Sequence, residues 1–179
     1  TAKFNMDDGV RRGFWLTDSL PTAQLLEADG YLDALQLTGG SSLLNPMYYF
    51  RGDVPLDEFI ASQPRPVGLG LRIVGRRMFR TYPFEEAFFL PQARQFREAL
   101  SMPLMLLGGI NRLDTVESAL AEGFNYVAMA RALLRDPFLI GSFQYEAVNV
   151  GQCVHCQKCM PTVYSGTKCV VRETTSMHP

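Results

Sequence analysis

Residues 102–143 contain the pattern that most restricts the fold of this chain. The segment "MPLMLLGG" (102–109) is a continuous apolar run, and "DTVESALAEG" (114–123) has helical character and ends at a glycine. A second apolar run, "NYVAMA" (125–130), precedes a second helical segment, "RALLRDPFLIGSF" (131–143). Strands without polar alternation are typical of parallel sheets covered on both faces. This alternation predicts neighbouring parallel strands with helices packed outside them.

The N-terminal region repeats the alternation. We expect a short strand over 2–6, a helix over 21–30 and a buried strand over 32–40. Pro21 suits the first turn of the expected helix, which lacks internal N–H partners. In the later helix, Asp114 and Glu117 have the spacing of a capping box.

An irregular excursion separates these two regions and covers residues 41–86. It contains a short expected helix over 56–63 and an apolar run over 67–75, for which periodicity leaves strand and helix open. An amphipathic helix is predicted over 85–100. Its apolar stripe consists of Phe89, Ala93, Phe96 and Leu100.

Composition excludes several classes of protein. The 179 residues are 47% hydrophobic and 20% charged, with a formal net charge of −1, so neither nucleic acid nor an anionic membrane is expected as a partner. The N-terminus lacks the pattern of a signal peptide, and a cytoplasmic location is expected. Because the chain opens on a strand without Met, we expect a preceding N-terminal part. Residues 145–179 lose the alternation, which divides the chain into 1–144 and a cysteine-rich extension.

Two strand-to-helix turns indicate an anion site. Gly108 and Gly109 follow one strand, and Ala130 and Arg131 follow the next. Glycine lets backbone N–H groups approach an anion, and an arginine adds a charged contact. In (β/α)8 barrels, adjacent turns of this kind bind phosphate. The alternative is a tight turn with a solvated arginine.

Lys3 is the charged residue of the first strand, where it shares a side with Asn5. Inside a barrel this charge would need an anionic partner, whereas on an edge strand it would lie in water. The loop 37–52 follows a strand end, where barrels place substrate-facing residues. Asn45, Met47 and Tyr48, with Tyr49, are candidates for a substrate pocket, and a place in the core is the alternative.

All four cysteines lie near the C-terminus, in "CVHCQKCMPTVYSGTKC". Cys153, Cys156 and Cys159 are spaced C-x2-C-x2-C, and Cys169 follows. This compact spacing is typical of iron–sulfur loops. Zinc is an alternative, because four sulfurs suit a tetrahedral ion, and free thiols without metal are a third possibility.

Five segments together resemble the C-terminal half of old yellow enzyme family proteins, the NADH:flavin oxidoreductases that include 2,4-dienoyl-CoA reductase-like members. They are "AKFNMDDG", "LDALQLTGG", "MPLMLLGGI", "NYVAMARALLRDP" and "CVHCQKC…C", in that order. The resemblance covers nearly the whole chain and implies an α/β fold, the C-terminal half of a (β/α)8 TIM barrel with a cysteine-rich C-terminal tail.

The resemblance also implies a chemistry. FMN would be bound by Lys3 at the flavin ring and by Gly108, Gly109, Ala130 and Arg131 at the phosphate. NAD(P)H would supply hydride for an activated C=C bond in an enone or enoyl thioester. The four cysteines would hold a [4Fe–4S] cluster, although the second and third are one residue closer than in cluster-bearing members. The first four strands, with the catalytic residues they carry, would lie in the missing N-terminal half.

Two other functions compete with this interpretation. One is a different phosphate-binding barrel enzyme, such as an isomerase or aldolase, for which Lys3 is the candidate catalytic group. The other is a non-catalytic interaction module stapled by zinc, in which residues 145–179 do the binding.

Overall fold

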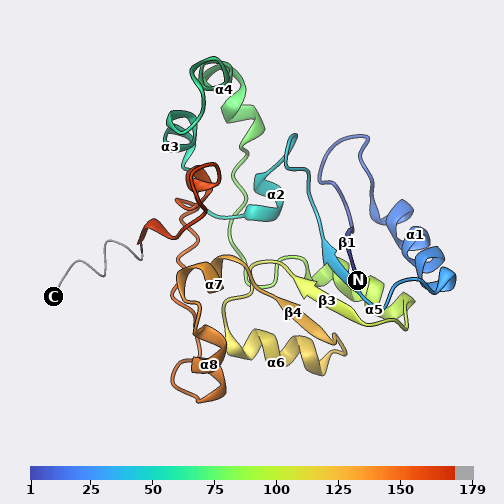
Figure 1. The fold of residues 1–179 in the computed structure, drawn as a ribbon. Coiled ribbons are helices and arrows are strands. Elements are labelled where there is room, and N and C mark those ends of the chain that lie inside the picture. The colour runs from blue at the N-terminus through green and yellow to red at the C-terminus, as the bar shows by residue number, and fades with distance from the viewer. Residues whose placement is uncertain (172–179) are drawn as a thin grey trace.

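The computed structural model describes residues 1–171, which form an α/β fold around one parallel sheet (Figure 1). The strands follow chain order across the sheet: β1 (Ala2–Asn5), β2 (Leu35–Thr38), β3 (Leu104–Leu107) and β4 (Tyr126–Ala128). All three pairings are parallel, as the apolar runs predict. The architecture is compatible with half of a TIM-barrel-like fold.

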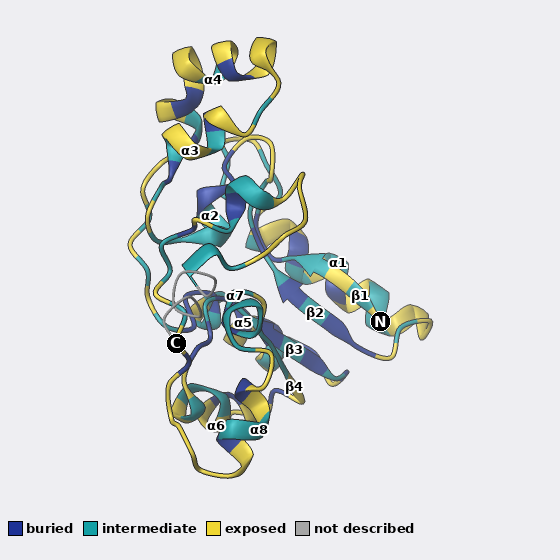
Figure 2. Ribbon diagram, turned by 60° about the vertical axis from the view of Figure 1, so that its left-hand side comes forward, coloured by how far each residue is buried: buried dark blue, intermediate teal, exposed yellow. Residues whose placement is uncertain are grey.

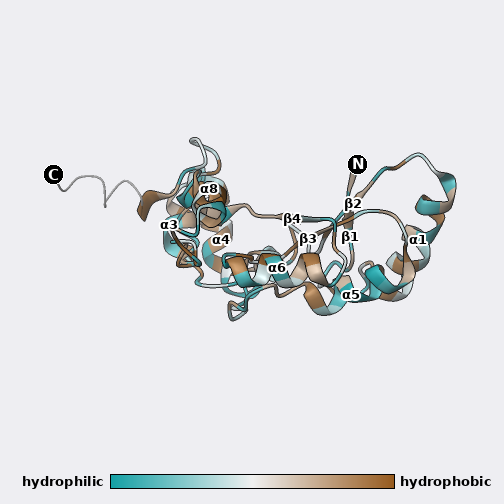
Figure 3. Cartoon of the chain, turned by 90° about the horizontal axis from the view of Figure 1, so that it is seen from below, coloured by the Kyte–Doolittle hydropathy of each residue, from teal (hydrophilic) through white to brown (hydrophobic). Residues whose placement is uncertain are grey.

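Helices cover one face of the sheet. These are α1 (Leu16–Asp29), α5 (Leu90–Ala99) and α6 (Leu113–Ala121), and Figure 3 shows α5 and α6 lying along the sheet. The alternate strand residues Leu35, Leu37, Leu104 and Leu106 face the helices and are fully buried (Figure 2). Since strand side chains alternate, the other face carries the polar residues of β1 and β2.

Helix α5 confirms the predicted apolar stripe. Phe89, Ala93 and Phe96 are fully buried in the core, and Leu100 is nearly so. The helix itself starts at Leu90, later than expected, because Phe84 to Phe89 turn back towards the end of β3, where the Phe88 N–H donates to the Gly108 carbonyl (2.9 Å).

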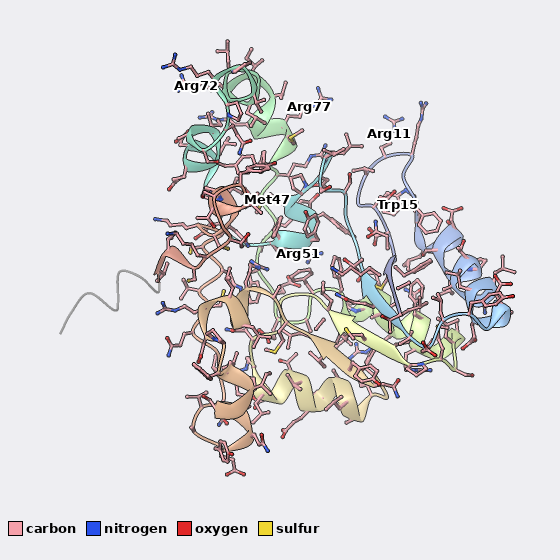
Figure 4. The ribbon with its side chains drawn as sticks, viewed as in Figure 1. Arg11, Trp15, Met47, Arg51, Arg72 and Arg77 are labelled. Atoms are coloured by element: carbon pink, nitrogen blue, oxygen red, sulfur yellow. The ribbon has the colours of Figure 1, made fainter. Side chains whose placement is uncertain are left out.

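The excursion after β2 forms three helices beyond the strand ends: α2 (Met47–Phe50), which is nearest to the sheet, and then α3 (Leu56–Ala61) and α4 (Arg65–Met78). The ambiguous apolar run is therefore helical. Gly68 and Gly75 allow α4 to pack closely on α3, since a Cβ at Gly75 would lie 3.0 Å from Leu56. The outer side of α4 is exposed, and Arg72 and Arg77 extend from it (Figures 2 and 4).

Two helical segments differ from expectation. The segment 131–143 forms two helices, α7 (Arg131–Arg135) and α8 (Leu139–Gln144), because Pro137 lacks an N–H and disfavours helix before it. Helix α1 begins at Leu16, which places Pro21 in its interior.

The predicted capping box at α6 is wrong: the N-cap is Arg112, without a side-chain cap. Instead Glu86 Oε1 accepts hydrogen bonds from the Asn111 and Arg112 N–H groups (2.6 and 3.0 Å).

The cysteine segment returns to the carboxyl end of the sheet. Val150 forms a bridge with Arg112, and Asn111 Nδ2 donates to the Gly151 carbonyl (2.9 Å). A short 3-10 helix, η1 (Met160–Thr162), follows. The division of the chain at residue 144 stays a prediction, and the end of the predicted extension lies outside the described residues. Among the described helices, none has the length and apolar character needed to cross a membrane.

Candidate functional site

A cavity of about 250 Å³ lies at the carboxyl end of the sheet, and we call it the sheet-end cavity. The five residues predicted to contact a cofactor all line it: Lys3, Gly108, Gly109, Ala130 and Arg131. Lys3 comes from within β1, and the other four come from the turns after β3 and β4, which the parallel topology brings to one edge. Whether they bind a flavin stays a prediction, but the structure brings them together.

Lys3 lies in water at the side of the sheet, and its contact with an anionic partner stays a prediction. It is exposed and lies on β1, an outer strand of the described sheet, and it also lines the sheet-end cavity. Gln36 is its partner in the parallel register, and Thr38 lies two residues further along β2 on the same face. These three polar side chains give the cavity hydrogen-bonding groups beside the sheet.

The glycine pair adopts backbone conformations that other residues rarely adopt. Gly108 has φ +136° and Gly109 has φ +74°. A Cβ on Gly109 would lie 2.7 Å from the rings of Phe84 and Phe88. Aromatic packing thus requires glycine here, whether or not an anion binds. In residues 1–171 the N–H groups of Gly109 and Ala130 donate no hydrogen bond, which leaves them available to a ligand.

Arg131 lies between the sheet-end cavity and the cysteines. Its Nη1 donates to the Arg51 carbonyl (3.3 Å). Burial lowers the pKa of Arg131, while the thiols of Cys153, Cys159 and Cys156 raise it. A guanidinium stays protonated in proteins, so Arg131 places a fixed positive charge at this wall.

The predicted substrate residues do not line the sheet-end cavity. Asn45 is buried and donates to the Gly9 carbonyl and Tyr82 Oη (both 2.8 Å). Met47 is fully buried against Phe79, on the side of α2 away from the sheet (Figure 4). Both belong to the core, which corrects their assignment.

Tyr48 is also held within the fold rather than in the cavity. Its hydroxyl donates to Asp7 Oδ2 (2.9 Å), and burial, followed by this hydrogen bond, raises its pKa. The residues of α2 that do reach the sheet-end cavity are Tyr49 and Phe50. A four-residue helix turns successive side chains to different sides, so an aromatic cluster alone does not identify the exposed ones.

The four cysteines line a second, small cavity of about 30 Å³, the cysteine cavity. All four are partly buried and free of disulfides. Burial raises the pKa of the Cys153 and Cys159 thiols, and Arg131 opposes this shift. However, in residues 1–171 no three His, Cys, Asp or Glu side chains gather in the way a single metal ion requires. The donor chemistry suits a metal, and whether the cysteines bind one stays a prediction.

The loop that carries the first cysteines is held in a strained conformation. His155 (φ +55°) and Gln157 (φ +58°) both have left-handed backbone angles. Gln157 Nε2 donates to the carbonyls of Phe50 and Arg51 (both 2.6 Å). Such strain persists only where surrounding contacts determine the conformation.

His155 belongs to both cavities. Its ring stacks on Phe84, with centroids 3.4 Å apart and an interplanar angle of 10°. Burial, and then the charge of Arg131, lower the pKa of His155 to about 4, so its imidazole is neutral near pH 7. Since Arg131 and His155 line both the sheet-end and the cysteine cavity, they form the wall between them.

A third cavity of about 470 Å³ opens between the excursion and the cysteine segment, and we call it the aromatic cavity. Its walls include Phe59, Phe79 and Tyr164, with Arg131 and Cys159 at the side shared with the cysteine cavity. Aromatic side chains and the guanidinium of Arg131 thus line the same cavity.

Sequence reasoning missed Gln36, Thr38, His155 and Arg135 as cavity residues. Gln36 and Thr38 were detectable, because they are the polar positions of an otherwise apolar strand. His155 lies inside the cysteine motif, but the cysteine spacing does not indicate that its ring lines a cavity. Arg135 carries no signal of its own beyond its position four residues after Arg131.

Comparison with known proteins finds one relative by sequence and a similar fold among solved structures. A scan against models of protein families finds no match. Over 173 residues, 97% of this chain, the sequence is 70% identical to the 4,4′-dithiodibutanoate disulfide reductase of Rhodococcus erythropolis. The chain spans 43% of the length of that relative.

Among solved structures, a 2-naphthoyl-CoA reductase in complex with 2-naphthoyl-CoA matches with a TM-score of 0.59. The match covers 88% of this chain and 20% of that one, at 17% identity. At this identity the likeness concerns the fold alone.

Proposed function

We propose that this chain is the C-terminal half of an FMN-dependent oxidoreductase barrel of the old yellow enzyme type. The observation that carries the proposal is the meeting of Lys3, Gly108, Gly109, Ala130 and Arg131 around one cavity. The name of the relative supports a general oxidoreductase role, since that protein is a reductase.

The residues of the sheet-end cavity fit a flavin mononucleotide. Backbone N–H groups at Gly109 and Ala130, with the guanidinium of Arg131, would hold the phosphate at the turns after β3 and β4. Lys3, with Gln36 beside it, would contact the polar edge of the ring. A bound flavin supplies transfer of a hydride, and a cation at its polar edge stabilises the reduced, anionic form.

The hydride would come from NAD(P)H and pass to an organic acceptor. An activated C=C bond, in an enone or enoyl thioester, is the first candidate acceptor. A disulfide is the second, and it is favoured by the 70% identity to a disulfide reductase together with four free thiols next to the proposed flavin cavity.

The remaining barrel strands would pair with β1 and β4, which are the outer strands of the described sheet. An open sheet edge favours pairing with further strands. We therefore expect the complete protein to bind FMN and the 179-residue chain alone to bind it weakly. A metal at the four cysteines stays a prediction, and we assign no step to it.

The test is an anaerobic absorption spectrum of the complete protein, followed by titration with FMN after removal of bound flavin. A band at about 450 nm is expected, with affinity lowered at least about tenfold in Arg131→Gln. Arg72→Gln, on the outer side of α4, is the matched control and should bind normally. A colourless protein that binds a sugar phosphate instead would identify a different barrel enzyme, and zinc without flavin would favour an interaction module.

The two acceptors are separated by kinetics. With NADH and NADPH as donors, oxidation of the donor is followed with an enone, an enoyl thioester and a disulfide. Turnover that depends on the disulfide and not on the C=C compounds would reject the ene-reductase assignment while keeping the flavin.

A further inference from the structure

We propose that the outer side of α4 rests on an anionic lipid surface, with its arginines at the lipid phosphates and Leu69 and Ile73 among the acyl chains. This contact is separate from the proposed function, because it involves no residue of the sheet-end cavity. It places α4 on the surface of a membrane and requires no segment that crosses one.

Positive charge is concentrated on α4. Four of its 14 residues are arginines, none is acidic, and a fifth arginine follows two residues after its end. The whole chain has 17 Lys and Arg residues against 18 Asp and Glu residues. The net charge of −1, from which no anionic membrane is expected, therefore averages over a helix that is locally cationic. The five arginines are Arg65, Arg72, Arg76, Arg77 and Arg80.

These arginines are available to a partner. All five are exposed, and Figure 4 shows Arg72 and Arg77 extending away from the fold. The ion pairs within residues 1–171 lie at α5 and α6 and include no residue of α4. Arg72 and Arg76 are four residues apart, and like charges at this spacing destabilise a helix. An anionic partner would remove that repulsion.

Two large aliphatic side chains lie among the arginines. Leu69 is 65% exposed and Ile73 is 80% exposed. The helical period places both on the same side as Arg65, Arg72 and Arg76. The opposite side of α4, with its two buried glycines, packs on α3 and fixes the helix to the fold. Leu69 and Ile73 thus stay in water unless a partner covers them, and burying them is favourable.

A groove of about 730 Å³ between α3 and α4 adjoins this side of the helix. Arg65, Leu69 and Arg72 line it from α4, and Asp57 and Gln63 line it from the opposite wall. Guanidinium groups pair well with phosphate oxygens, whereas the carboxylate of Asp57 opposes an anion. With two arginines against one carboxylate, the groove offers a phosphate headgroup a net positive wall.

The mixture of arginine and aliphatic side chains favours lipid over nucleic acid. Arginine contacts the phosphates of both, but acyl chains also cover leucine and isoleucine. Nucleic-acid strands instead use aromatic side chains for stacking, and α4 contains none. The stem of an arginine can lie along acyl chains while its head reaches the phosphates. Helix α4 also projects at one end of the described fold, where a broad surface can reach it (Figure 1).

The first test measures binding to vesicles. The complete protein is mixed with phosphatidylcholine vesicles that contain about 30% phosphatidylglycerol, or with phosphatidylcholine vesicles alone, and bound protein is sedimented. We expect at least about tenfold tighter binding to the anionic vesicles. Raising the salt concentration to about 0.5 M should release most of the protein, because salt screens the charges.

The second test removes charge from α4. Arg72→Gln/Arg76→Gln should weaken binding to the anionic vesicles at least about tenfold, since each arginine near such a surface contributes about fivefold. Arg94→Gln/Arg112→Gln removes the same charge at α5 and α6 and is the matched control. It should change the affinity less than about threefold.

The third test keeps the charge and removes the aliphatic side chains. Leu69→Gln/Ile73→Gln should weaken binding to the anionic vesicles about tenfold, because the acyl chains no longer cover these side chains. Both positions are exposed, so the fold should not change. An affinity equal to that of wild type would reject insertion of Leu69 and Ile73.

Three further results would overturn the inference. The first is no binding to anionic vesicles, or equal binding to neutral ones. The second is an equal loss of affinity in the α4 variant and its control. The third is binding to a DNA duplex but not to vesicles, which would make α4 a nucleic-acid surface. None of these measurements involves flavin, so the proposed function would survive them, whereas a colourless protein that binds vesicles would reject the proposed function alone.

Discussion

The sheet-end cavity and the cysteine cavity share a wall but are built differently. The first is made by turns that follow parallel strands, and its glycines are fixed by aromatic packing on Phe84 and Phe88. The second is made by a loop whose shape depends on hydrogen bonds to residues more than a hundred positions earlier, at Phe50 and Arg51. The first is thus part of the folding core, whereas the second can be loosened separately.

The largest expected effect is on the sheet-end cavity, from Gly109→Ala. Alanine at φ +74° is strained, and its Cβ would lie 2.7 Å from two aromatic rings. We expect the free energy of unfolding to fall by about 2–4 kcal/mol. Urea denaturation measures it. Gly141→Ala, within α8 and with no atom near the added Cβ, is the control and should be neutral or slightly stabilising. If Gly109→Ala and Gly141→Ala changed stability equally, packing of Phe84 and Phe88 would not be what requires glycine at position 109.

A smaller effect should follow from releasing the cysteine loop with Gln157→Ala. The variant removes two hydrogen bonds to the carbonyls of Phe50 and Arg51. We expect the free energy of unfolding to fall by about 2 kcal/mol. Cys153 and Cys156 should react faster with a thiol reagent, and the affinity for flavin should not change. Gln63→Ala, which removes an exposed hydrogen bond to Ser62, is the control. Loss of flavin binding in Gln157→Ala would show that the two cavities are not separable.

The same difference explains what the sequence predicted and what it did not. The periodicity of apolar residues predicts the strands and the buried stripe of α5. The parallel arrangement of those strands predicts that Lys3 and Arg131 lie at one cavity. The break between α7 and α8 could also be predicted, because Pro137 lies between them. The places of Asn45, Met47 and Arg135 were not, because they depend on contacts between the excursion and distant parts of the chain.

Tyr48→Phe sharpens the distinction between Tyr48 and Tyr49. Removing the hydroxyl breaks the hydrogen bond to buried Asp7 and should cost about 1–2 kcal/mol of unfolding free energy. Flavin affinity should stay within about twofold of wild type, because Tyr48 does not line the sheet-end cavity, whereas Tyr49→Ala should weaken it more. The reverse order in a flavin titration would restore Tyr48 as a ligand contact.

The smallest expected effect is a pH dependence from His155, which belongs to both cavities. Its pKa falls from 6.5 to about 4 on folding, because burial and Arg131 disfavour the charged ring. Between these values the unfolded chain binds a proton that the folded chain does not, so stability is complete above about pH 6.5 and falls as the pH approaches 4.

Because the side chain is only partly buried, we expect a loss of about 1 kcal/mol, well below the full value of the shift. His155→Phe keeps an aromatic ring on Phe84 but cannot titrate, so its stability should depend less on pH. Denaturation curves of both proteins at pH 7.5 and 4.5 give the difference. If the two proteins lose the same stability on acidification, the ring is not held neutral, and the wall between the cavities would carry a second positive charge beside Arg131.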